Sequence, residues 1–185
     1  MQELSLNILD IAENSTRAGA KLVEIDVIED PDADRLTIRI KDDGCGMDEQ
    51  LLHSVRDPFT TTRTTRKVGL GVPFLEEAAR ATGGELHIRS TPGAGTEVEA
   101  TFGYSHIDRM PLGDLAATVS TLIQCHEHTD FVFIHVFRGR TFRLDTRELR
   151  EVLGGVPPSA PDVVLWIRDY INENLQKIYM EGNAK

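Results

Sequence analysis

The chain has 185 residues, a length that suits one domain or one domain with a substantial appendage. Its formal net charge of -10 argues against binding nucleic acid or an anionic membrane over a broad surface, because such binding needs clustered Lys and Arg. Its two cysteines lie far apart in sequence and predict no disulfide framework. The first residues lack the pattern of a signal peptide, and no apolar run approaches the roughly 18 residues of a membrane span, so we expect a cytoplasmic protein.

The first predicted element is an amphipathic helix over residues 2–17, where apolar side chains recur at steps of three and four. A second stripe of this helix is polar and contains Asp10 and Asn14. An isolated helix usually exposes such a stripe to solvent. Glu13 directly precedes Asn14 but points roughly 100° away from it on a helix, so it is not expected to act with the stripe.

Two strands are predicted next, over residues 21–29 and 35–41, because apolar and polar side chains alternate in both. The short, turn-rich link between them predicts a hairpin. The second strand leads into Asp42-Asp43-Gly44-Cys45-Gly46. On its own this stretch is typical of a plain turn, because Asp and Gly tolerate the backbone angles that turns need.

A long polar segment follows this turn. Asp48 is predicted to cap a short helix, and residues 57–67 then lack any periodicity. Loops of this length inside compact domains are usually functional. A glycine-containing stretch leads into a helix that has Pro73 in its first turn and ends at about Thr82. We expect this helix to bury Phe74, Leu75, Ala78 and Ala79. Glycines before a helix N-terminus let the backbone approach an anion, and the free N–H groups there favour phosphate.

Two further alternating segments, residues 85–90 and 96–102, predict a second pair of strands. The order helix, two strands, glycine turn, helix, loop, helix, two strands predicts an α/β (α+β) two-layer sandwich, with helices on one face of a mixed sheet. We assign residues 1–103 to this unit and residues 104–185 to a C-terminal α/β extension.

The motifs of the first unit, taken in order, resemble the nucleotide site of the GHKL ATPase superfamily, which has the Bergerat fold. This group includes gyrase ATPase subunits, the mismatch-repair protein MutL, bacterial histidine kinases and anti-sigma serine kinases. The motifs are Asp10 and Asn14, Asp42-Asp43-Gly44-Cys45-Gly46, Asp57-Pro58-Phe59, Gly69-Leu70-Gly71 and Gly95-Thr96. The stretch Glu13-Asn14-Ser15 is particularly similar to MutL.

The resemblance implies a pocket for ATP and Mg²⁺. By position, Asn14 would coordinate Mg²⁺, which suits an amide oxygen because this ion keeps most of its water and phosphate ligands. Asp42 would accept the exocyclic amine of adenine, while Gly44 and Gly46 would let the base pack close to the main chain. The other implied nucleotide-binding residues are Phe59, Gly69, Leu70, Gly71 and Thr96.

Four further residues near the phosphates have two interpretations each. Arg63, Arg66 and Lys67, in a segment that resembles the short lid of histidine kinases, either reach the γ-phosphate or belong to an exposed basic loop. Asp10 stands where most of the superfamily carries a Glu general base and histidine kinases commonly carry Asn. It is therefore either a base that activates water or a partner hydroxyl, or an outer-shell contact to the metal.

The extension is predicted to contain a helix over residues 112–123 and strands at residues 131–137 and 141–144. A helix capped by Asp145 is predicted to end near Leu153, and a last helix to begin after Ser159 with Pro161 in its first turn. The apolar stripe of the last helix, which begins at Val164, either packs on the chain's own sheet or forms a face for a partner or a second copy. Cys125-His126-Glu127-His128 is expected to be a polar loop, because four consecutive side chains cannot all face one tetrahedral ion. His135 is expected to be a hydrogen-bonded core residue.

Two functions from different classes follow. The first is an enzyme that uses Mg·ATP and either hydrolyses it or transfers its γ-phosphate to a Ser or Thr of a partner protein. The second is a non-catalytic module that reports its ATP or ADP state to a partner. The whole chain resembles stand-alone histidine-kinase-like ATP-binding proteins of anaerobic bacteria, which implies a redox or hydrogenase complex as that partner. An ordinary histidine kinase ranks third, because no helix pair with a phosphoacceptor His precedes the ATP unit in this sequence.

Overall fold

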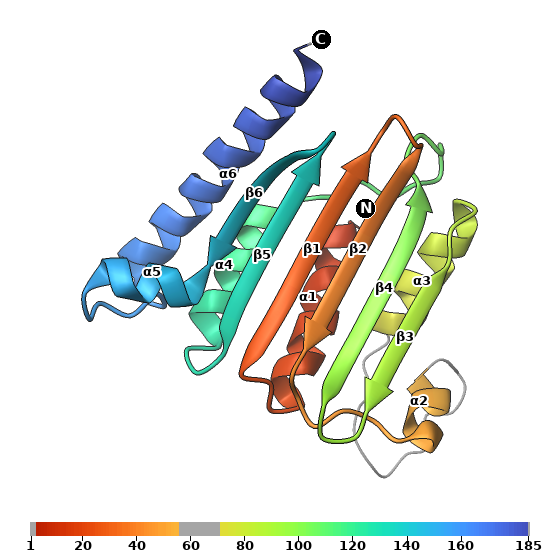
Figure 1. Cartoon of the computed structure of the whole chain (residues 1–185), viewed down its shortest axis with the longest axis horizontal. Coiled ribbons are helices and arrows are strands. Elements are labelled where there is room, and N and C mark those ends of the chain that lie inside the picture. The colour runs from red at the N-terminus through yellow and green to blue at the C-terminus, as the bar shows by residue number, and fades with distance from the viewer. Residues whose placement is uncertain (1–2, 56–70, 185) are drawn as a thin grey trace.

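The computed structural model describes residues 3–55 and 71–184. Over these residues the strands form a single mixed sheet in the order β3-β4-β2-β1-β5-β6 (Figure 1). The strands are β1 (Leu22–Asp30), β2 (Arg35–Asp42), β3 (Leu86–Thr91), β4 (Gly95–Gly103), β5 (Asp130–Phe137) and β6 (Arg140–Asp145). Each strand end lies within one residue of its predicted position, because period-two patterning sets strand limits closely.

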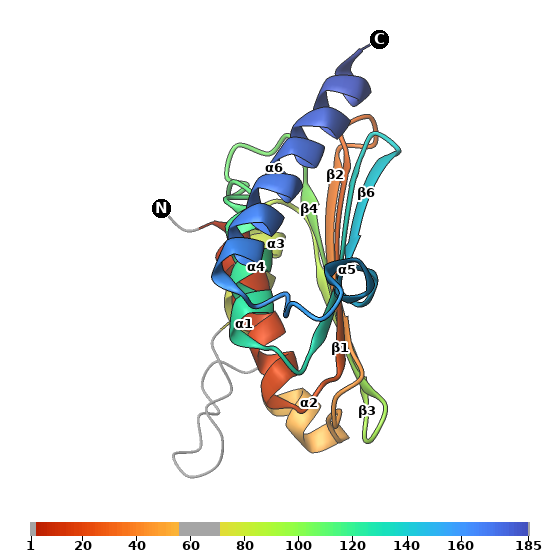
Figure 2. The same cartoon turned by 90° about the vertical axis from the view of Figure 1, so that its left-hand side faces the viewer.

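Most of the helices form a layer on one face of this sheet (Figure 2). The helices are α1 (Leu4–Arg17), α2 (Glu49–Val55), α3 (Gly71–Ala81), α4 (Leu115–Cys125), α5 (Thr146–Leu153) and α6 (Pro161–Asn183). A mixed sheet covered by α1, α3, α4 and α6 confirms the predicted α/β sandwich. Among the described helices, the 23-residue α6 included, none is both long and apolar enough to cross a membrane.

Two details of the predicted helices are wrong. Phe74 is 44% exposed, because Leu75 and Ala79 are the positions of α3 that turn toward the core and Phe74 lies to one side of them. Helix α4 begins at Leu115, three residues later than predicted. The side chain of Asp114 accepts a hydrogen bond from the first turn and caps the helix at that point.

The sheet register brings two of the predicted site residues together. Strand β2 is antiparallel to both β1 and β4. In the β2–β4 pair, Asp42 at the end of β2 lies opposite Thr96 near the start of β4. Helix α1 packs over β1 and β2, and its Ser15 hydroxyl donates to the Asp42 carboxylate. The site is therefore assembled from a helix and two neighbouring strands.

The segment after the second predicted strand pair continues the same sheet. Strand β5 is parallel to β1, and β6 is the outermost strand beyond it. Helix α6 packs against α4, β5 and β6. Its buried stripe consists of Val164, Ile167, Ile171 and Ile178. Of the two alternatives for this stripe, packing within the chain is the one that is confirmed.

A buried polar cluster fixes the C-terminal end of α6 to the sheet. The Oε1 atom of Glu29 on β1 lies 2.7 Å from Nε2 of His135 on β5 and accepts a hydrogen bond from the hydroxyl of Tyr179 on α6. His135 is fully buried, so its predicted role as a hydrogen-bonded core residue is confirmed. Burial opposes ionisation of Glu29, but the hydrogen bonds from His135 and Tyr179 outweigh it and lower the pKa of this carboxyl below its ordinary value of 4.5.

Because of this cluster, the free energy of unfolding should decrease as the pH falls through the acid range. A carboxyl with a lowered pKa in the folded state contributes stability that is fully present above its unfolded pKa of 4.5 and is lost as the pH falls through the folded value. We expect Glu29→Gln to lower the free energy of unfolding at neutral pH by about 2 kcal/mol, because it removes a charge-assisted acceptor from two buried donors. The variant should also lose less stability than the unaltered protein as the pH falls below 4.5. Urea unfolding across a pH series measures both effects.

The matched control is Glu24→Gln, on the same strand and with a half-exposed side chain that pairs with Lys41. It should change stability little and leave the acid dependence as it is. Stability curves for Glu29→Gln and Glu24→Gln that run parallel in pH would contradict the role given to Glu29.

Candidate functional site

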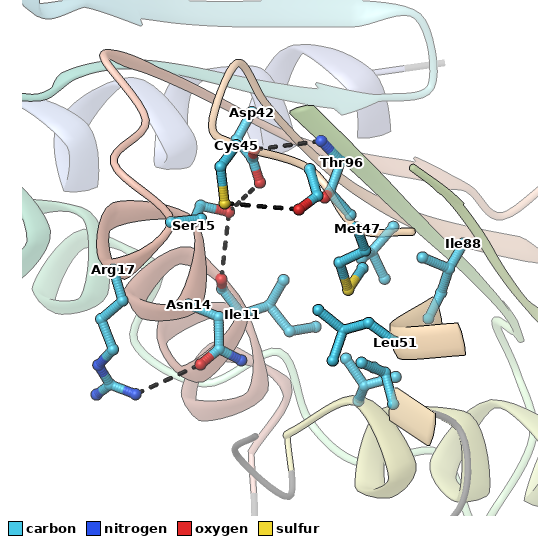
Figure 3. Close-up of a pocket in the computed structure, with 15 residues that line it drawn as sticks. Ile11, Asn14, Ser15, Arg17, Asp42, Cys45, Met47, Leu51, Ile88 and Thr96 are labelled. Carbon is cyan, nitrogen blue, oxygen red and sulfur yellow. Dashed lines mark hydrogen bonds between the residues drawn. The ribbon is translucent and has the colours of Figure 1, made fainter. Parts of the chain in front are cut away.

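A pocket of about 520 Å³ lies between helix α1 and one end of the sheet (Figure 3). Its walls come from α1, the end of β2 and the turn after it, α2, the start of α3, and strands β3 and β4. The lining residues are Ile11, Asn14, Ser15, Arg17, Ala18, Asp42, Cys45, Gly46, Met47, Leu51, Val55, Val72, Ile88, Thr96 and Val98. The same cavity is thus lined by three residues that are distant in sequence and were predicted to share a site: Asn14, Asp42 and Thr96.

Asp42 forms the polar floor of the pocket. Its carboxylate is buried, and Oδ2 accepts a hydrogen bond of 2.6 Å from the Ser15 hydroxyl. Its Oδ1 accepts from the backbone N–H groups of Gly44, at 2.9 Å, and Thr96, at 3.2 Å. A carboxylate has about four lone-pair sites, so three fixed donors orient the group and leave it able to accept one more. The pocket therefore presents an oriented anionic acceptor to any ligand that offers an N–H.

The two glycines of the turn after β2 have different tasks. Gly46 lines the pocket with φ +66°, and a Cβ there would lie 2.0 Å from the carbonyl oxygen of Thr91. Gly44 does not line the pocket, and a Cβ there would lie 3.0 Å from Oδ1 of Asp42. Gly44 thus allows its own N–H to reach Asp42, while Gly46 lets the turn pass close to β3. The turn geometry predicted for this stretch is present and at the same time shapes the pocket.

The side walls of the pocket are apolar. Ile11, Met47, Leu51 and Ile88 border the pocket to which Asp42 belongs (Figure 3), and Val98 also lines it. Sequence reasoning missed these residues as site residues, because an apolar side chain on a pocket wall follows the same periodicity as one in the core. A largely apolar pocket with an oriented polar acceptor suits an aromatic ring that carries an amino group.

The other end of the pocket is polar and lies along α1. Asn14 lines the pocket, and its Oδ1 accepts a long hydrogen bond of 3.4 Å from Arg17. Asp10, one turn earlier on α1, is exposed and is not among the lining residues. A Cβ at Gly71 would lie 2.9 Å from the Cβ of Asp10, so the start of α3 packs directly against it. The N-terminal end of α3, Asp10 and Asn14 are therefore neighbours.

Several predicted site residues fall outside the part of the chain that the structure describes. These are Phe59, Arg63, Arg66, Lys67, Gly69 and Leu70. Ser15 was missed at the sequence level, although its place directly after Asn14 on α1 was a usable signal. Within the described residues no group of three or more His, Cys, Asp or Glu side chains is arranged to hold a metal ion. Of the predicted polar loop, Cys125 is instead the last residue of α4, and His126, Glu127 and His128 follow the helix.

A comparison of the sequence with protein families identifies the domain that contains most of this pocket. Residues 1–106, more than half of the chain, match the family described as histidine kinase-, DNA gyrase B-, and HSP90-like ATPase. The chain belongs to this ATPase family. Membership implies that the first unit is an ATP-binding domain of the GHKL type, and the resemblance stated from its motifs is thereby confirmed.

Curated relatives of this GHKL domain include three bacterial proteins. A putative sensor protein of Shewanella frigidimarina is 33% identical over 109 residues, which make up 58% of this chain and 17% of that protein. The non-motile and phage-resistance protein of Caulobacter vibrioides is 31% identical over 63% of this chain and 15% of its own length. The autoinducer 2 sensor kinase/phosphatase LuxQ of Vibrio cholerae is 33% identical over 54% of this chain and 12% of its own length. The chain thus spans less than a fifth of each of these relatives.

Solved structures support the same fold for this GHKL domain. The MutL ATPase domain of Aquifex aeolicus, complexed with ADP, superimposes with a TM-score of 0.50 at 16% identity, over 81% of this chain and 68% of that one. The N-terminal domain of a DNA repair protein gives a TM-score of 0.53 at 13% identity, over 78% of this chain and 53% of that one. At these identities the likeness concerns the fold alone.

Proposed function

We propose that the chain binds Mg·ATP in the pocket between α1 and the sheet, and either hydrolyses it or transfers its γ-phosphate to a hydroxyl of a partner protein in a regulatory role. The observation that carries this proposal is the Asp42 carboxylate, which three donors orient and which keeps one acceptor position free at the pocket floor.

At the adenine end, Asp42 would accept the exocyclic amine of the base. The Thr96 hydroxyl lies 2.8 Å from the Ser90 hydroxyl, so Thr96 is held in place beside Asp42. The aliphatic and thioether walls of the pocket would contact the two faces of the ring. A hydrogen bond to a charged acceptor contributes roughly 1.5–3 kcal/mol, which is enough to select adenine once water is excluded.

At the phosphate end, Asn14 would supply an amide oxygen to Mg²⁺, which fits an ion that takes few protein ligands in nucleotide sites. The ion, when bound, would offset the charge of the phosphates. Asp10 would accept the proton of the attacking water or partner hydroxyl. The N-terminal end of α3, which packs on Asp10, would direct its free N–H groups toward the phosphates. Phosphoryl transfer depends mainly on such positioning and charge stabilisation.

The fate of labelled γ-phosphate tests the enzymatic part of this proposal. The protein is incubated with Mg·ATP carrying a γ-label, alone and with candidate partner proteins. Label in water supports hydrolysis, and label on a Ser or Thr of a partner supports a kinase. Label that stays in ATP, with ATP nevertheless bound, would overturn turnover and leave nucleotide sensing, the non-catalytic alternative in which the bound nucleotide controls a partner.

The two cysteines give a direct test of where nucleotide binds. Both are exposed, but Cys45 lines the pocket and Cys125, at the end of α4, does not. With Mg·ATP at ten times its Kd, alkylation of Cys45 by a maleimide should become about tenfold slower, because only the free protein exposes this thiol. Alkylation of Cys125 should keep its rate. Mass spectrometry of the two peptides over time measures both rates, and equal effects at the two cysteines would contradict binding in this pocket.

A further inference from the structure

The segment between α4 and β5 is fixed against the link between α1 and β1, and also contacts α1 itself. The Thr129 hydroxyl donates to the Ala20 carbonyl at 3.1 Å, and the Asp130 N–H donates to the Lys21 carbonyl at 2.8 Å. In the same loop, Nε2 of His126 lies 2.9 Å from Oε1 of Glu13 on α1. This loop lies beyond residues 1–106, which match the ATPase family. A segment outside the family match therefore contacts the helix that carries Asn14.

From Glu13 the contacts continue to the nucleotide pocket. The second carboxylate oxygen of Glu13, Oε2, lies 3.5 Å from Nη2 of Arg17. The other terminal nitrogen of Arg17, Nη1, donates to Oδ1 of Asn14 at 3.4 Å (Figure 3). Both Arg17 and Asn14 line the pocket. A continuous series of polar contacts thus runs from His126 through Glu13 and Arg17 to the proposed metal ligand.

Burial divides this series into a fixed part and a movable part. The side chains of His126 and Glu13 are only 22% and 27% exposed, whereas that of Arg17 is 64% exposed. A long exposed guanidinium has many rotamers and is held weakly by any single contact. Glu13, held by His126, provides a counterion in a set position, and this favours the rotamers of Arg17 that lie beside Asn14. Without the His126 contact, the side chains of Glu13 and Arg17 could move away from Asn14 together.

We propose that His126 is a positioning residue for the nucleotide site: through Glu13 it holds the guanidinium of Arg17 beside Asn14, and so links the C-terminal segment to the affinity for Mg·ATP. This inference rests on the proposed function. With nucleotide bound, Arg17 would bring positive charge to the pocket, and Glu13 would offset part of it. The link acts through contacts of side chains, and it requires no rearrangement of the fold.

Binding of Mg·ATP to single and double variants tests this. His126→Ala should raise the Kd of Mg·ATP about fivefold, the size expected when one partly buried hydrogen bond is lost. His126→Gln, whose amide can still donate to Glu13, should restore an affinity within about twofold of the unaltered protein. His128→Ala, at an exposed histidine two residues along the same loop, is the matched control and should leave the Kd of Mg·ATP unchanged. Isothermal titration calorimetry measures each Kd, and thermal melting checks that the fold is retained.

A double-mutant cycle identifies the route. If His126 acts through Arg17, adding His126→Ala to Arg17→Ala should cause no further loss of affinity. An unchanged Kd for His126→Ala, or the same fivefold loss in the Arg17→Ala background, would overturn the inference while the unaltered protein still binds Mg·ATP. No binding of Mg·ATP by the unaltered protein would overturn the proposed function and this inference together.

Discussion

Replacing Asp42 by Asn should raise the Kd of ATP by about 10- to 100-fold, the range that corresponds to losing one hydrogen bond to a charged acceptor. The Asn oxygen can still accept from the N–H groups of Gly44 and Thr96, which bond the same carboxylate oxygen in the unaltered protein. The new amide N–H₂ then takes the place of Oδ2. It would oppose the amino group of adenine, donor against donor, so the loss should be specific to the base. Calorimetric titration with ATP and with inosine triphosphate, which lacks that amino group, measures the selectivity.

The neighbouring Asp43 provides the control. Its Oδ1 accepts from the N–H groups of Lys21 and Leu22, at 2.7 and 2.9 Å, and it does not line the pocket. Asp43→Asn removes the same charge one residue away and should leave the Kd of ATP within about twofold. ATP binding by Asp42→Asn that equals that of Asp43→Asn would refute the assignment of the pocket floor.

The second large effect is expected at Asp10, on turnover and not on binding. Asp10→Asn keeps the size of the side chain but cannot accept a proton, so the rate of hydrolysis or phosphotransfer should fall by about 100-fold or more. The Kd of Mg·ATP should change little, because Asp10 does not line the pocket. Single-turnover measurements with labelled ATP, at protein concentrations above the Kd, separate the two quantities.

Glu77→Gln serves as the control for Asp10, since Glu77 is exposed on the adjacent helix α3 and the change also removes one negative charge. Its turnover should match that of the unaltered protein. If Asp10→Asn keeps full turnover, Asp10 is not the base. If instead Asp10→Asn raises the Mg²⁺ concentration needed for ATP binding and keeps the turnover rate, Asp10 is an outer-shell contact to the metal.

The local elements of this fold follow from the sequence, but the long-range strand pairings, β2 with β4 and β1 with β5, do not. Alternation places the strands to within one residue, since burial of one face of a strand imposes a period of two directly. The parallel pairing of β5 with β1 carries no such signal. An apolar strand such as Phe131 to Phe137 indicates burial on both faces, but its pattern does not say which neighbour covers its edge.

The candidate site was predictable where several motifs occur in the order of a known family. Taken alone, Asn14 belongs to an ordinary polar helix stripe and Asp42 to an ordinary turn, and both were assigned to the site through the GHKL resemblance. Ile88 and Val98 did not stand out, because a wall that contacts a ligand and a wall that contacts the core both select apolar side chains. The contact of His126 with Glu13 could not be predicted from the sequence either, because it joins two residues separated by 113 positions.

The parallel pairing of β1 with β5 also affects how the chain folds during synthesis. Strand β1 is completed by residue 30, whereas its neighbour on one side begins only at residue 130. Until β5 is made, a growing chain that has already formed β1, β2 and β4 has an open edge of unpaired N–H and C=O groups in what becomes the middle of the sheet. Such edges pair readily with other chains. Late arrival of β5 thus makes the unfinished ATPase unit the form of this protein most exposed to aggregation.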